Sequence, residues 1–94
     1  MPVRLRGDFN GLIGDLLCLS HSDVVTDDRG SIVLLKEGME VIAFDEDVDD
    51  AGPCYLVASG RVVPSPDSLQ HHGSRWCLQI DEKGVRTIPT LDDA

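Results

Sequence analysis

Short apolar runs alternate with polar stretches along the whole chain, and glycine, proline or acidic residues separate most of them. Runs rich in Val, Ile, Leu and aromatic residues between turn formers are typical of β-strands. The runs that predict strands are 15–20, 31–35, 40–44, 54–59, 75–81 and 85–88, with 3–6 and 24–25 as shorter candidates. Because 40–44 and 54–59 flank an acidic stretch, we expect a central hairpin with residues 45–53 as an exposed, mobile loop.

The segment 75–81 shows the clearest alternation of apolar and polar positions. Trp76, Leu78 and Ile80 alternate with polar residues and with Cys77. Successive side chains of a strand point to opposite faces of the sheet. The pattern therefore predicts that Trp76, Leu78 and Ile80 are buried and that Cys77 lies on the solvent-facing side.

Two further elements are expected in the C-terminal half. Glu82–Gly84 has the composition of a tight hairpin turn, with Gly at the position that needs positive φ. We therefore expect 85–88 to pair back on 75–81. The Ser-Pro-Asp sequence at 65–67 is a typical helix start, which predicts one helical turn within 65–73.

Five or six short strands, glycines at the corners and one helical turn before the last hairpin are typical of an all-β fold. The order of elements resembles a small SH3-like barrel of antiparallel strands, which is an architecture and not a family. A small two-layer β-sandwich is the alternative. We expect a single β domain over residues 1–94, in which 1–13 is rich in loops and 89–94 is a frayed acidic tail.

The charge of the chain is unevenly distributed. It has 8 basic and 17 acidic side chains, for a formal net charge of −9, and nine of the acids lie between Asp27 and Gly52. A field of this sign repels nucleic acid phosphates and anionic membrane surfaces, so we expect neither as a partner. No apolar run approaches the roughly 18 residues of a membrane-spanning helix, and no stretch has the pattern of a signal peptide.

The acidic stretch is the first candidate for a binding site. Asp45, Asp47 and Asp49 alternate as in an EF-hand calcium loop, but the sixth position holds Asp50 in place of Gly and the twelfth holds Leu56 in place of Glu. Three interpretations remain: a solvated hairpin tip, a cation site with oxygen ligands, or a contact surface for a basic protein. The acids expected to contact such a partner are Asp45, Glu46, Asp47, Asp49 and Asp50.

Cysteines and histidines form the second candidate. The residues of zinc-binding type are Cys18, His21, His71, His72 and Cys77. Cys18 and His21 are a short-range pair, but the chain lacks a second pair with a recognised zinc spacing. The alternative is that the three cysteines, Cys54 included, are reduced and buried in the strands of a cytoplasmic protein, with His71 and His72 as loop residues.

No spacing singles out catalytic residues. The sequence has no Gly-rich phosphate loop, nucleophile elbow or His-Glu helix motif, and solvated acids stay ionised, which does not suit acid–base catalysis. We therefore expect a non-catalytic, cytoplasmic interaction or regulatory module that binds a basic protein surface through residues 45–52 and needs no cofactor. Metal binding is the alternative. The oligomeric state is open, because an exposed first or last strand could pair across a dimer axis.

Overall fold

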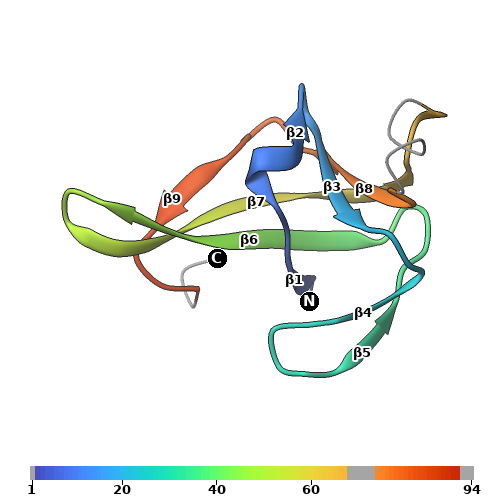
Figure 1. Cartoon of the computed structure of the whole chain (residues 1–94), viewed down its shortest axis with the longest axis horizontal. Helices are drawn as coiled ribbons and strands as arrows, with labels where there is room; N and C mark the ends of the chain where they lie inside the picture. The colour runs from blue at the N-terminus through green and yellow to red at the C-terminus, as the bar shows by residue number, and fades with distance from the viewer. Residues whose placement is uncertain (1, 68–73, 92–94) are drawn as a thin grey trace.

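The computed structural model describes residues 2–67 and 74–91, and this part of the chain is built mainly from β-strands (Figure 1). The strands are β1 (Val3–Arg6), β2 (Leu12–Ile13), β3 (Leu16–Ser20), β4 (Val24–Thr26), β5 (Ile32–Leu34), β6 (Glu40–Asp49), β7 (Gly52–Pro64), β8 (Trp76–Ile80) and β9 (Arg86–Ile88). A short 3-10 helix, η1 (Phe9–Gly11), lies within the segment expected to be mostly loop. The expected all-β class is confirmed.

Most of the strands belong to one curled sheet. Its hydrogen-bonded path runs β1-β6-β7-β8-β3-β2, β9 also pairs with β7, and β4 and β5 form a separate two-stranded ribbon. β1 is an edge strand as expected, but it pairs parallel to β6, with Val3 opposite Val41. The prediction of antiparallel strands is therefore wrong at this edge, because the long connection through β2–β5 lets β1 and β6 run in the same direction. Among the described strands the path stays open, so the sheet curls without closing into a hydrogen-bonded barrel.

β8 and β9 lie one after the other along the same side of β7 (Figure 1). Both are antiparallel to β7, so the prediction that 85–88 pairs back on 75–81 is wrong. The turn between them is present, with Gly84 at φ 65° and its N–H donating to the carbonyl of Asp81 at 3.1 Å. Because β7 is 13 residues long, it offers pairing positions to both strands and the turn bulges out between them.

β6 and β7 form a long hairpin whose turn projects at one end of the molecule (Figure 1). β6 continues to Asp49 and β7 begins at Gly52, so only Asp50 and Ala51 remain as the turn. The predicted loop 45–53 is therefore wrong. Asp disfavours strands, but strand preference depends on context, and here the pairing that begins in the core continues into a solvated tip.

The core lies on the inner face of the curled sheet. Its buried residues are Leu5, Leu17, Leu35, Val41, Ala43, Ala58, Val62, Leu78 and Ile80. Leu78 and Ile80 are buried as predicted, and Trp76 is half-buried against this cluster. Leu5 of β1 and Leu17 of β3 join the same core, so the two ends of the open sheet are held together by apolar contacts.

Cys77 departs from its prediction. It alternates with Leu78 onto the outer face, yet its side chain is 0% exposed, so the expectation that it faces solvent is wrong. Two buried hydroxyls lie beside it, with Ser65 Oγ at 3.3 Å and Ser74 Oγ at 3.9 Å from its Sγ. The outer face of β8 is therefore covered at this position by the residues that flank the connection between β7 and β8.

β7 and β8 lie close together at Gly60. A Cβ added there would lie 2.0 Å from the carbonyl oxygen of Gln79 and 3.1 Å from Cα of Ile80. Gly60 is not among the residues with positive φ, so the site requires glycine for space and not for backbone conformation.

The β4–β5 ribbon covers the core with one face only. Val25 and Val33 pack against the core, whereas Ile32 on the other face is 81% exposed. The turn of the ribbon reaches β1, where the N–H of Asp28 donates to the carbonyl of Arg4 at 3.1 Å and the two side chains form an ion pair at 2.9 Å. The ribbon thus protects the outer edge of β1.

Asp23, just before β4, connects the ribbon to β8. Its carboxylate accepts a hydrogen bond from the indole Nε1 of Trp76 at 2.7 Å and forms an ion pair with Arg75. The hydrogen bonds from Arg75 and then from Trp76 lower the pKa of Asp23 below its usual 3.8. The contacts with Arg75 and Trp76 therefore favour the charged form of the Asp23 carboxylate.

Two expectations fall partly outside the described residues. The helical turn within 65–73 lies mainly in 68–73, and the frayed tail includes 92–94. The described end of the chain is held in place, since Arg4 Nη1 donates to the carbonyl of Leu91 at 2.8 Å. No helix within the described residues is long and apolar enough to cross a membrane.

Candidate functional site

The acidic end of the β6–β7 hairpin, Asp45–Asp50, is hereafter the acidic ribbon. At its base, Arg6 of β1 forms ion pairs with Asp45 at 3.9 Å and with Glu46 at 3.0 Å. The same guanidinium lies 5.1 Å from the ring centroid of Phe44, a cation–π distance. Two of the five predicted contact acids are therefore already paired with a cation, and sequence reasoning missed Arg6 because it lies about 40 residues away along the chain.

The outer half of the acidic ribbon is different. Asp47, Asp49 and Asp50 are exposed and form no ion pair within the part of the chain that the structure describes. Asp49 shapes the turn, since its carboxylate accepts from the N–H of Ala51 at 2.8 Å. Cys54 opposes Asp47 in the register, and burial together with the carboxylates of Asp49 and Asp47 raises the pKa of its thiol. Negative charge therefore accumulates at the tip, and no cation of residues 2–67 or 74–91 forms an ion pair with it.

Apolar surface accompanies this charge. Val48 alternates with the aspartates and is 71% exposed. An open groove of about 810 Å³ lies between the acidic ribbon and residues 89–91. Its lining residues are Glu46, Asp47, Val48, Pro53, Cys54, Tyr55, Pro89, Thr90 and Leu91. Tyr55 is fixed there by an edge-to-face contact with Phe44 at 6.5 Å between ring centroids. The residues after β9 were predicted to be frayed, so no sequence signal pointed to their part in this groove.

The structure brings together only part of the predicted Cys/His set. Cys18 and Cys77 lie directly opposite each other on β3 and β8. Ser74 lies beside both, with its Oγ 3.1 Å from Cys18 Sγ. His71 and His72 lie outside the described residues. Within 2–67 and 74–91, no three His, Cys, Asp or Glu side chains are grouped in a way that could hold a metal ion.

A second hollow, of about 740 Å³, lies where the two ends of the open sheet approach each other. Its lining residues are Arg6, Gly7, Asp8, Asn10, Ile13, Cys18, Leu19, His21, Asp45 and Ser74. Cys18 and His21 thus share this seam, as their short spacing allowed. The sulfur of Cys18 contacts the hydroxyl of Ser74 at 3.1 Å on the wall of this hollow.

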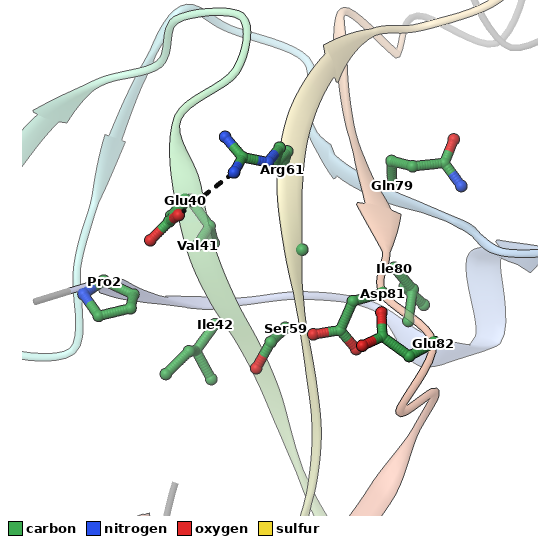
Figure 2. Close-up of a pocket in the computed structure, with 11 residues that line it drawn as sticks. Pro2, Glu40, Val41, Ile42, Ser59, Arg61, Gln79, Ile80, Asp81 and Glu82 are labelled. Atoms are coloured by element: carbon green, nitrogen blue, oxygen red, sulfur yellow. Dashed lines mark hydrogen bonds and ion pairs between the residues drawn. The ribbon is translucent and has the colours of Figure 1, made fainter.

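A third hollow, of about 500 Å³, lies over β6, β7 and the end of β8 (Figure 2). Asp81 and Glu82 lie at the β8 end of it, across the strands from the ion pair between Glu40 and Arg61 at 3.5 Å. Arg61 already has a carboxylate partner, Gln79 donates to Asp15, and Ser59 accepts from Arg86, so this hollow lacks the convergent polar groups of a small-molecule site.

Comparison with known proteins adds no relative to this picture, since no protein-family model, curated protein or solved structure matches the chain. The function of this chain is therefore inferred from its own residues. Among its surfaces, the acidic ribbon combines unpaired charge, exposed apolar side chains and a backbone-paired scaffold.

Proposed function

We propose that this protein is a non-catalytic interaction module that binds a protein with a basic surface through the acidic ribbon. The observation that supports it most is the state of Asp47, Asp49 and Asp50: three exposed carboxylates at a projecting tip, without a cationic partner among the described residues. Uncompensated charge on a convex surface speeds the encounter with an oppositely charged partner.

The scaffold supports the proposal as well. Asp47 and Asp49 are paired across the hairpin with Cys54 and Gly52, so their backbone positions are set by the sheet. A surface that is ordered before binding loses less conformational entropy on association than a mobile loop does. Val48 and Tyr55 provide apolar area next to the charge, which is the composition of a protein contact and not of a purely solvated turn.

The compartment in this proposal is the cytoplasm. The support for it is that Cys18, Cys54 and Cys77 are all free thiols, the state that a reducing compartment maintains.

The test uses the full-length chain immobilised as bait, with an extract of its source as the pool of partners. The variant D47N/D49N/D50N removes the charge of the tip, while the amide oxygen of Asn at position 49 can still accept from Ala51. The control variant E37Q/D67N/E82Q removes the same charge from exposed sites elsewhere. We expect basic proteins that bind the wild-type chain and the control variant to be lost from the ribbon variant.

Association rates with the captured protein then complete the test. At about 10 mM ionic strength the ribbon variant is expected to associate about tenfold more slowly than wild type, and the difference should shrink at about 150 mM. Equal rates for both variants at low salt, or capture that does not depend on the ribbon, would refute the proposal.

A further inference from the structure

Cys18 and Cys77 occupy a position in the sheet that fits a disulfide bond. They are direct partners in the antiparallel pair of β3 and β8, so both side chains lie on the same face. The register of β3 on β8 also places Asp15 opposite Ile80, and the N–H of Ile80 donates to the carbonyl of Asp15 at 2.8 Å. Asp15 and Ile80 are therefore a hydrogen-bonded pair. Since hydrogen-bonded and non-hydrogen-bonded pairs alternate, Cys18 and Cys77, three positions along, form a non-hydrogen-bonded pair.

Such pairs bring the backbones closest. Their Cα atoms lie about 4.5 Å apart, which is inside the range of about 4.4–6.8 Å that disulfides span. A hydrogen-bonded pair, with its Cβ atoms further apart, would suit the bond less well. The register of β3 on β8 therefore places the two thiols where a bond can form with little movement of the backbone.

The sulfur atoms already share a neighbour. Ser74 Oγ is 3.1 Å from Cys18 Sγ and 3.9 Å from Cys77 Sγ. Ser65 Oγ is 2.8 Å from Ser74 Oγ and 3.3 Å from Cys77 Sγ. Because sulfur is a weak hydrogen-bond partner, a rotation of Cys18 away from Ser74 and toward Cys77 gives up little.

The two cysteines differ in exposure. Cys18 is half-buried and lines the hollow of about 740 Å³ at the seam, so its side chain is partly accessible from solvent. Cys77 is fully buried. This is the arrangement of an accessible thiol backed by a second thiol that can attack it. Cys54 lies on a different strand, and its buried position beside two aspartates raises its pKa.

We propose that Cys18 and Cys77 form a reversible cross-strand disulfide when the protein meets hydrogen peroxide. The thiolate of Cys18 attacks one peroxide oxygen, the O–O bond breaks, and hydroxide leaves and takes up a proton to give water. Cys18 is then a sulfenic acid. The sulfur of Cys77 attacks it and loses its proton, the S–O bond breaks, and a second water leaves. Two thiols and one peroxide thus give one disulfide and two waters, and a dithiol reverses the reaction.

This modification would change the seam directly. Cys18 would exchange its contact with Ser74 for a covalent bond to β8, so the seam hollow would lose its thiol and β3 could no longer separate from β8. The inference does not depend on the proposed function of the acidic ribbon, since the two thiols lie on β3 and β8.

The experiment treats the reduced full-length protein with hydrogen peroxide and follows its intact mass, with peptide mapping of the product. We expect the wild-type protein to lose about 2 Da and to give a peptide pair linked through Cys18 and Cys77. The matched control C54A should behave in the same way. In C77S the sulfenic acid of Cys18 has no partner, so dimedone should trap it; in C18S neither the link nor the trapped product should appear.

C18S changes a half-buried residue, so it keeps the test valid if C77S fails to fold. A 2 Da loss that persists in C18S, or a wild-type protein that only gains oxygen atoms at Cys18, would overturn the proposal. Reappearance of the original mass after treatment with a dithiol is expected as well, and a product that resists reduction would also contradict it.

Discussion

Replacing Gly60 with alanine tests the close approach of β7 and β8. The new Cβ would lie 2.0 Å from the carbonyl oxygen of Gln79 and 2.8 Å from its carbonyl carbon, distances that real Cβ atoms do not show. The obstacle is backbone, so no rotamer change can relieve it. β8 would have to move away from β7 by about 1 Å before the distance from this Cβ to the carbonyl oxygen reached 3.0 Å.

The free-energy cost of this movement is that of the contacts between β7 and β8 that it breaks. The bond from Asp81 N–H to the carbonyl of Ser59, now 2.9 Å, would lengthen beyond hydrogen-bonding range, and Ile80, 8% exposed, would lose part of its packing. Each lost hydrogen bond costs about 0.5–1.5 kcal/mol, and partial loss of a core contact costs about as much again. We expect G60A to lower the free energy of unfolding by about 1–3 kcal/mol, out of roughly 5–14 kcal/mol for a chain of this size.

Urea unfolding followed by the fluorescence of the single tryptophan measures this loss. The matched control is G7A, where the nearest atom to an added Cβ is the side-chain Cδ2 of Leu17 at 3.1 Å. A side chain can shift where a carbonyl group cannot, so G7A should cost less than half as much as G60A. A G60A protein within about 0.5 kcal/mol of wild type would refute the reasoning, because it would mean that β7 and β8 do not approach as described.

Two further predictions concern the β4–β5 ribbon and its attachment. Because Arg75 and Trp76 lower the pKa of Asp23 below 3.8, the native state favours its charged form; this stabilisation is complete above about pH 5 and is lost as the pH falls through the lowered pKa. Thermal unfolding between about pH 5 and pH 2 should therefore show a shallower loss of stability for D23N than for wild type, and parallel curves would contradict the role of this carboxylate. On the β4–β5 ribbon, I32S should change the free energy of unfolding by less than about 0.5 kcal/mol, because Ile32 is exposed. V33S, on the face that packs against the core, should lower the free energy of unfolding by about 1–2 kcal/mol. Equal effects of the two changes in urea unfolding would show that the faces of the ribbon are assigned wrongly.

The sequence predicts where the strands lie better than it predicts their partners. Alternation is a local property, so Leu78 and Ile80 could be assigned to the buried face from their spacing alone. It contains no information about which strand lies alongside, and so β9 was expected on β8 and was found on β7. The same limit applies to Cys77, whose alternation gave the correct face but not the serines that cover it.

Sequence-based prediction of the candidate sites has the same limit: it identifies residues but not the long-range contacts between them. The five acids could be singled out by composition, but their strand conformation could not, because Asp has a low intrinsic preference for strands. The neutralisation of Glu46 by Arg6 joins positions that only the β1–β6 pairing brings together. Cys18 and Cys77 were both named as residues of zinc-binding type, yet the register that makes them a pair is visible only once β3 is placed on β8.

That placement also bears on how the chain reaches its native state. Leu16 pairs with Gln79 and Val3 pairs with Val41, so β3 and β1 each pair with strands that are distant in the sequence. In contrast, β6 and β7 are joined by a two-residue turn. Closing a short loop costs little entropy and closing a long one costs more, so the β6–β7 hairpin is the natural early structure, with β1 and β3 docking late. The carboxylates at its tip then repel each other in the earliest structure that forms. The charge proposed to attract a partner to the finished protein would thus slow the folding of the protein itself.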